Sequence, residues 1–281
     1  MSRLAEIESH IGSMQELLEI VGAMRSLAGM RVQEAQRSLP GVRRYAESLA
    51  AGIADTLLLD QGAAASRGVA GPGAVVLCTS EHGFVGGFNE HLVDAVGEWL
   101  GPRDLLFVLG GRGAALAEER GRKPRLAVPM ATRCAAATET VQRLTEELYR
   151  LIARGSIAGL AVVFARYRQG SQSAVERRSL LPIDVAAPGA GMSRQPPLHN
   201  LSAAALQEKL TSEYVFALLM EAVVESIASE NAARLAAMEA ARQNVSRKLD
   251  GLRRDAREAR QSEITAELLD LVTGAEAQAA G

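Results

Sequence analysis

The residues whose types and spacing most clearly allow ligand binding form a glycine-rich segment at residues 79–89. This segment follows an apolar run and has the sequence TSEHGFVGGFN. The backbone N–H groups of a glycine-rich turn between a strand and a helix can bind phosphate. However, the segment lacks the G-x-G-x-x-G spacing and the Gly-Lys-Ser/Thr of a P-loop, and no ribose-binding carboxylate follows Leu109-Gly110. The second glycine cluster, residues 110–113, has the same weakness. The pattern favours a tight structural turn, or a loop that docks on a protein, over a nucleotide site.

Other reactive residue types are too scattered to indicate a reaction. Cys78, His82, His91 and Cys134 match neither a C-x-x-C nor an H-E-x-x-H pattern, so core and surface roles are favoured over a metal site. No serine lies in a G-x-S-x-G motif, and no pair of carboxylates stands out. We therefore predict no catalytic residue, no metal and no cofactor.

A dense charged run, residues 253–261 (RRDAREARQ), precedes an apolar stretch that contains Ile264, Leu268 and Leu271. One interpretation is a solvated helix face with ion pairs four residues apart. The alternative is a helix whose apolar end inserts into a partner while the polar side chains contact its rim.

Long helices at both ends of the chain must position these residues. Apolar residues recur every three or four positions from Met1 to about Leu59 and again from Leu201 to about Val272. Such helices would be roughly 85 Å and 110 Å long, too long for a compact domain, so we expect them to pair as a coiled coil. The apolar periodicity alone allows the two helices to pair in parallel or antiparallel orientation, and we expect the antiparallel one. Pro40-Gly41 predicts a kink or short break in the first helix.

Between these helices, short apolar runs alternate with helical segments, which predicts a Rossmann-like α/β domain with a mostly parallel sheet. The expected strands are 74–78, 105–109, 159–164 and 173–181, and the expected helices are 91–100, 114–120 and 138–154. Linkers are expected at 61–73 and 186–197. The fold class is thus α/β with a long antiparallel coiled coil, and the predicted segments are 1–60, 70–185 and 200–281.

Composition excludes several function classes. Among 281 residues, 31 Lys and Arg against 33 Asp and Glu give a formal charge of −2, which argues against nucleic-acid binding. Two cysteines cannot build a disulfide framework, so a reducing compartment is expected. No signal peptide and no run of about 20 apolar residues is present, so a cytosolic chain without its own membrane span is expected.

Several motifs together resemble one family. SEHGFVGGFN at residues 80–89 is similar to the SDRGLCGGLN signature of the gamma subunits of F-type ATP synthases, and Ala23-Met24 with Arg31 resembles part of their first helix. The resemblance continues through LLPI at residues 180–183, ESIASE at 225–230 and RQSEITAEL at 260–268. It covers the chain from end to end. Departures at Gly22, Val85 and Ala256-Arg257 suggest a divergent bacterial branch.

The resemblance implies a rotor shaft that couples ion flow through a membrane ring to ATP synthesis or hydrolysis in a catalytic hexamer. It implies alpha, beta and epsilon subunits and a c-subunit ring as partners, at the cytoplasmic side of a bacterial inner membrane. The implied hexamer contacts are Met24, Arg31, Arg260, Gln261, Ile264 and Glu267. The implied loop near the lever of the catalytic subunits contains Ser80, Glu81, His82, Gly83, Gly86, Gly87 and Asn89.

Two other functions compete with this one. The α/β domain could belong to a ligand-binding regulatory enzyme, although the phosphate- and ribose-binding residues are missing. The helices could instead form a generic coiled-coil scaffold, in which case the match at residues 260–268 would be a coincidence.

Overall fold

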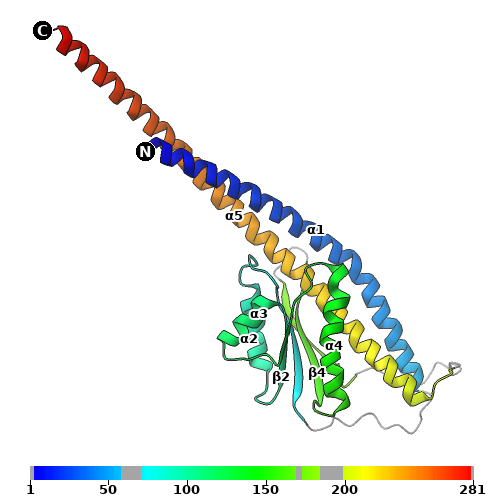
Figure 1. The fold of residues 1–281 in the computed structure, drawn as a ribbon. Coiled ribbons are helices and arrows are strands. Elements are labelled where there is room, and N and C mark those ends of the chain that lie inside the picture. The colour runs from blue at the N-terminus through cyan, green and yellow to red at the C-terminus, as the bar shows by residue number, and fades with distance from the viewer. Residues whose placement is uncertain (1–2, 58–70, 169–172, 184–198, 280–281) are drawn as a thin grey trace. The chain divides into compact units, whose positions relative to one another are not determined.

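The structure is a computed structural model that describes residues 3–57, 71–168, 173–183 and 199–279 (Figure 1). The helices are α1 (Arg3–Leu57), α2 (Phe88–Trp99), α3 (Gly111–Glu119), the 3₁₀ turn η1 (Cys134–Ala136), α4 (Ala137–Ala153) and α5 (Ala203–Ala279). The strands are β1 (Gly73–Cys78), β2 (Leu105–Leu109), β3 (Leu126–Val128), β4 (Gly159–Arg166) and β5 (Ala174–Leu181).

The strands form one sheet in the order β3-β2-β1-β4-β5. The pairs β1–β2, β1–β4 and β2–β3 are parallel, and β5 runs antiparallel to β4. Apart from Arg166 at the end of β4, the central strands consist of apolar or small residues because both of their faces are buried, as is typical of parallel sheets. The predicted mostly parallel sheet is therefore confirmed.

Side chains alternate between the two faces of the sheet and build two cores. Val76 and Phe107 belong to the core that α4 and parts of α1 and α5 cover. Val75 and Leu77 belong to the core that α2 and α3 cover. Figure 1 shows α2 and α3 on one side of the strands and α4 on the other. The glycine-rich segment leaves the sheet at the carboxyl end of β1.

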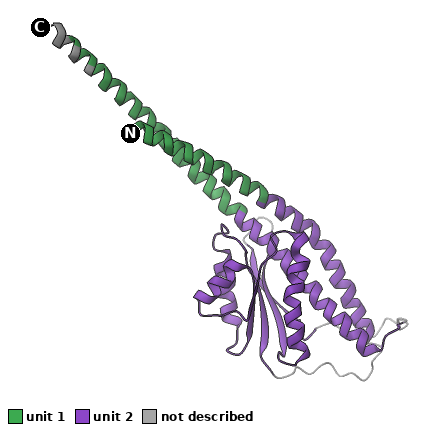
Figure 2. Ribbon diagram, in the orientation of Figure 1, with its two compact units in different colours: residues 1–27, 235–281 green, residues 28–234 purple. Residues whose placement is uncertain are grey.

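The chain divides into two compact units, coloured in Figure 2: residues 1–27 with 235–281, and residues 28–234. In the first unit α1 and α5 pack antiparallel, since Arg25 Nε lies 2.7 Å from Glu239 and Arg260 lies 2.6 Å from Glu8. In the second unit the remaining parts of both helices pack beside the sheet. The predicted antiparallel helix pair is thus confirmed. The three-segment division of the chain stays a prediction.

Of the kink or short break predicted at Pro40-Gly41, the break is wrong, because α1 continues through Pro40, while the kink stays a prediction. Proline costs a helix about 3 kcal/mol. Here Pro40 faces solvent while Leu39, Ala35 and Ala46 are buried in the core around it, and this packing offsets the cost.

Two other details differ from expectation. β3 was not predicted, because a three-residue strand between Pro124 and Pro129 is too short to show a periodic pattern. The expected linkers 61–73 and 186–197 lie almost entirely outside the described residues. No helix in the described ranges has the length and apolar character that crossing a membrane requires.

Candidate functional site

The glycine-rich segment is a folded turn whose polar groups bond to one another. Asn89 Oδ1 accepts a 3.0 Å hydrogen bond from the Ser80 N–H, and Asn89 Nδ2 donates one of 2.8 Å to Ser80 Oγ. Ser80 Oγ in turn donates to the His82 carbonyl at 2.9 Å. Ser80 and Asn89 are both buried. These bonds fasten the two ends of the segment together at the carboxyl end of β1.

Glu81 occupies the place where an anion would bind. Glu81 Oε2 accepts hydrogen bonds from the Gly111 N–H at 3.0 Å, at the start of α3, and from the Met130 N–H at 2.9 Å. Helix N-termini favour negative charge, and here the chain supplies its own carboxylate. A ligand phosphate would have to displace Glu81, so the geometry does not support a phosphate site at residues 110–113.

Close packing explains the glycines of the second cluster. A Cβ atom on Gly113 would lie only 2.0 Å from Thr79 Oγ1. Gly110 has a φ of 111°, in the range that favours glycine, and a Cβ there would lie 2.6 Å from the Ser80 carbonyl. These glycines allow α3 to approach β1 closely.

The middle of the first segment presents an aromatic side chain on a constrained backbone. Phe84 has a φ of 62° and its side chain is 68% exposed. Gly86 also has a positive φ, of 58°. The neighbouring Gly83 carbonyl accepts a 3.4 Å hydrogen bond from Arg234, which is itself paired with the buried Glu230. Burial raises the pKa of Glu230, while the positive charge of Arg234 opposes this shift.

Four of the predicted hexamer contacts lie together near the end of α5. Arg260, Gln261, Ile264 and Glu267 are all exposed. Arg260 pairs with Glu8 of α1, but the two side chains are 61% and 49% exposed. Such a surface pair contributes about 0–1 kcal/mol, so Arg260 can exchange Glu8 for another partner at little cost.

The other two predicted contacts lie elsewhere. Met24 is half-buried beside the Arg25–Glu239 pair, and about 30 Å of helix separates Glu239 from Arg260 at 1.5 Å per residue. Arg31 belongs to the other compact unit, where it donates a 2.6 Å hydrogen bond to the Thr132 carbonyl. The six predicted contacts therefore do not form one cluster.

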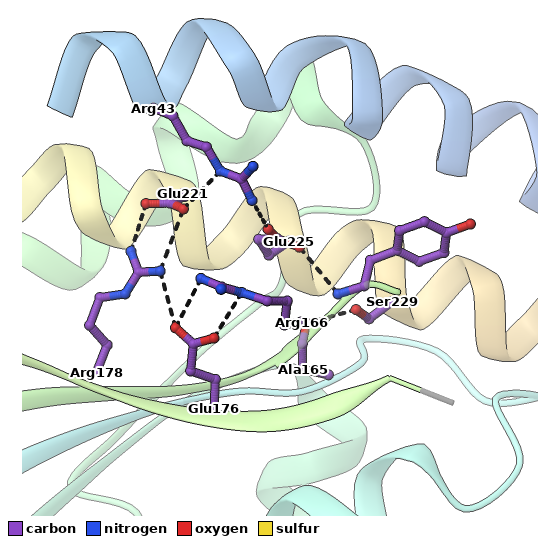
Figure 3. Close-up of polar contacts among 9 residues, drawn as sticks. Arg43, Ala165, Arg166, Glu176, Arg178, Glu221, Glu225 and Ser229 are labelled. Carbon is purple, nitrogen blue, oxygen red and sulfur yellow. Dashed lines mark hydrogen bonds and ion pairs between the residues drawn. The ribbon is translucent and has the colours of Figure 1, made fainter. Parts of the chain in front are cut away.

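A buried ionic network on α5 was not predicted (Figure 3). Glu221 accepts hydrogen bonds from Arg178 of β5 at 2.6 Å and from Arg43 of α1 at 3.1 Å. Burial alone would raise the pKa of Glu221, but the hydrogen bonds and charges of these two arginines lower it. Burial would likewise lower the pKa of Arg178, but Glu221 and Glu176 raise it. Both shifts favour the charged forms.

The same face of α5 also binds the end of β4. Glu225 accepts a hydrogen bond from Arg43 with one oxygen and a 3.2 Å bond from the Tyr167 N–H with the other. One turn further, Ser229 Oγ donates to the Ala165 carbonyl at 2.7 Å. Glu225 is only 2% exposed.

One signal in the sequence could have revealed this network. Glu221, Glu225 and Ser229 recur every four residues within a run of α5 that is otherwise apolar or small. Carboxylates are rarely buried unless they are paired. Their place on the inward face of a helix therefore indicates arginine partners, although the sequence does not show which ones.

The cysteines show no sign of reactivity. Cys78 is fully buried in the sheet, and burial raises the pKa of its thiol to about 12. Cys134 is half-buried, and desolvation raises its pKa as well. Within the described ranges no three His, Cys, Asp or Glu residues come together as a group that could hold a metal ion.

Comparison with known proteins gives matches over nearly the whole chain. The family model described as ATP synthase matches residues 3–278. The ATP synthase gamma chain of Phenylobacterium zucineum (strain HLK1) is 28% identical over 306 aligned residues, which cover 99% of this chain and 100% of the relative.

Solved structures share the fold. A chain in the Euglena gracilis mitochondrial ATP synthase assembly of OSCP, F1 and c-ring matches with a TM-score of 0.58 at 16% identity, covering 92% of this chain and 96% of that one. A chain in the Tetrahymena thermophila mitochondrial ATP synthase central stalk and c-ring matches with a TM-score of 0.56 at 15% identity, covering 79% and 99%. With the family model matched almost end to end, the chain belongs to the ATP synthase gamma-chain family.

Proposed function

We propose that the chain is the central rotor shaft of an F-type ATP synthase and transmits torque between the membrane ring and the catalytic hexamer. One observation carries the proposal beyond family membership. Glu8 of α1 pairs with Arg260, and α1 begins at Arg3, about 7.5 Å of helix beyond this pair, whereas α5 continues to Ala279. Roughly 20 Å of α5 therefore extends past the start of α1.

The side chains of this extension suit insertion into a partner. Ile264, Leu268, Leu271 and Val272 are each more than half exposed. Contiguous exposed apolar side chains usually mark an interaction surface. Arg260 and Gln261 precede them and can contact carboxylates or carbonyls at the rim of the partner. The end of α5 is therefore suited to an apolar binding surface with a polar rim, which we assign to the alpha and beta subunits.

Two further contacts complete the proposed assembly. The loop that contains His82, Gly83 and Phe84 would meet the lever of a catalytic subunit. The α/β domain would hold the epsilon subunit and rest on the c-subunit ring. The two solved structures described above come from assemblies that include a c-ring, which supports this placement. The chain would then lie peripherally at the cytoplasmic side of a bacterial inner membrane.

In this role the chain performs no chemistry of its own. An asymmetric shaft touches each catalytic subunit differently, and it can favour one conformation of a site only through contacts that differ between conformations. The geometry of residues 79–113 agrees with such a role, because Glu81 accepts the hydrogen bond of the Gly111 N–H at the start of α3, where a bound phosphate would otherwise lie.

Reconstitution with the alpha, beta and epsilon subunits and the c-ring of the same organism tests the proposal. We expect the chain to co-purify with the hexamer and ATP hydrolysis to rotate a bead fixed to its α/β domain. Micromolar ATP binding by the isolated chain would instead support a ligand-binding enzyme. A stable helical chain that the hexamer does not retain would support a scaffold.

A further inference from the structure

The polar contacts of Figure 3 join four elements, α1, α5, β4 and β5, which a rotor must hold in fixed positions relative to one another. We infer that Glu221 and Glu225 are positioning residues, which clamp α5 to α1 and to the β4–β5 edge of the sheet so that torque passes between the α/β domain and the shaft without slippage. This inference rests on the proposed rotor function. All the residues involved belong to the compact unit of residues 28–234.

Arg43 makes the connection between the two helices. Its Nε donates to Glu221 at 3.1 Å and its Nη2 donates to Glu225. One guanidinium thus spans two carboxylates a full turn apart on α5. A guanidinium presents several donors in a fixed fork, whereas a lysine ammonium has one centre. The contact therefore defines the axial register of α1 against α5.

Glu225 and Ser229 make the connection between α5 and the sheet. They bind the Tyr167 N–H and the Ala165 carbonyl, which lie at the carboxyl end of β4. On the same side of α5, Ser226 Oγ donates to the Cys78 carbonyl at the end of β1, at 3.4 Å. Side chains of α5 thus hold the ends of two central strands by their backbone atoms.

Arg178 extends the connection to the edge strand β5. It donates to Glu221 at 2.6 Å and to Glu176 at 3.1 Å, and its guanidinium carbon lies 5.4 Å from the centre of the Phe164 ring. Glu176 also pairs with Arg166 of β4 at 2.8 Å. A force on either β4 or β5 is therefore transmitted through these contacts to the Glu221 carboxylate on α5.

Burial of charge here needs a reason besides stability. A buried ion pair is often no more stabilising than apolar side chains of similar volume. Apolar contacts are non-directional, so they resist sliding of a helix along a sheet only through shape. Hydrogen bonds to backbone atoms at fixed positions are lost as soon as the helix shifts. The network thus supplies the resistance to shear that a rotating shaft needs.

The experiment uses the reconstituted, membrane-inserted ATP synthase with two variants of the chain. Glu225→Gln keeps the shape of the side chain and removes its charge. Arg43→Lys keeps the charge and removes the fork, at a side chain that is already 44% exposed. Glu139→Gln is the matched control, because Glu139 pairs with Arg143 on the exposed face of α4. ATP hydrolysis and ion pumping are measured on the same vesicles, and hydrogen exchange of the Tyr167 amide on the full chain.

We expect both variants to assemble and to hydrolyse ATP, but to pump fewer ions per ATP hydrolysed. The Glu139→Gln control should keep both activities. Exchange of the Tyr167 amide should rise about tenfold in Glu225→Gln, because it loses a charge-assisted hydrogen bond. Wild-type pumping per ATP in both variants would overturn the inference and leave the rotor function intact.

Other outcomes are also decisive. If Glu225→Gln does not assemble, Arg43→Lys decides alone. Failure of Arg43→Lys to assemble would overturn the inference, because the network would then serve folding. A wild-type chain that gives no ion-pumping complex would instead refute the proposed function.

Discussion

Replacing Glu221 with glutamine should destabilise the α/β-containing unit measurably. The Glu221 side chain is only 8% exposed and accepts hydrogen bonds from two arginines. Removing one partner of a buried ion pair costs about 3–5 kcal/mol when the other charge is left buried and alone. Here Arg43 is 44% exposed and Arg178 keeps Glu176 as a partner, so the penalty is smaller. We therefore expect a loss of about 2–3 kcal/mol, close to one charged hydrogen bond.

Thermal and urea unfolding of the full chain provide the assay. For a unit of about 200 residues, each kcal/mol shifts Tm by roughly 2–4 °C, so Glu221→Gln should lower the Tm of this transition by about 4–12 °C. The matched Glu139→Gln control, on an exposed pair, should change stability by less than about 0.5 kcal/mol. A loss below about 1 kcal/mol in Glu221→Gln would refute the reasoning, because the network would then be no stronger than a surface pair.

The pH dependence gives an independent check of the same residue. The folded-state pKa of Glu221 is lowered from its ordinary value of 4.5 by Arg178 and Arg43 against the effect of burial. The unfolded chain therefore binds more protons in this range, and stability increases with pH. The contribution is fully present above pH 4.5 and is lost as the pH falls through the folded-state pKa. As the pH falls from 5 through the folded-state pKa of Glu221, the Glu221→Gln variant should therefore lose less stability than the wild-type chain.

Three other substitutions or treatments have defined outcomes. Gly113→Ala should cost about 1–3 kcal/mol in urea unfolding, because its Cβ would lie 2.0 Å from Thr79 Oγ1; unchanged stability would show that α3 can move away freely. The Arg260→Ala/Gln261→Ala double variant should lower ATP hydrolysis of the complex about tenfold without releasing the chain, and unchanged turnover would show that these side chains only face solvent. The Cys78 thiol, buried and with a pKa of about 12, should resist alkylation at pH 8 until the chain unfolds, as mass spectrometry of labelled peptides would show.

The sequence of the glycine-rich segment at residues 79–89 predicted its local structure but not the role of its side chains. This sequence predicted a tight turn or a loop that docks on a protein. The bonds between Ser80 and Asn89 show the turn, and docking stays a prediction. The use of Glu81 to close the start of α3 could not be predicted, because Gly111 and Met130 follow it by 30 and 49 residues. Only the folding of β1 beside β2 brings these groups together.

Local periodicity by itself determined the long helices, the longer apolar strands and the order of the elements apart from the short β3. These features depend on residues three or four apart in a helix, or adjacent in a strand, so they are visible in any short window of the sequence. Family motifs such as RQSEITAEL, which lie both near the ends of the chain and in its central domain, then indicated its role. None of this required knowledge of which distant segments meet.

Tertiary structure decided everything that depends on pairs far apart in the chain. It showed that α1 passes through Pro40 unbroken, because burial of Leu39 and Ala46 outweighs a local preference. It also determined the partners of Glu221: Arg43, 178 residues earlier, and Arg178, 43 residues earlier. A carboxylate has the same local pattern whether it faces solvent or two arginines, and only the packing of α5 against α1 and β5 distinguishes the two.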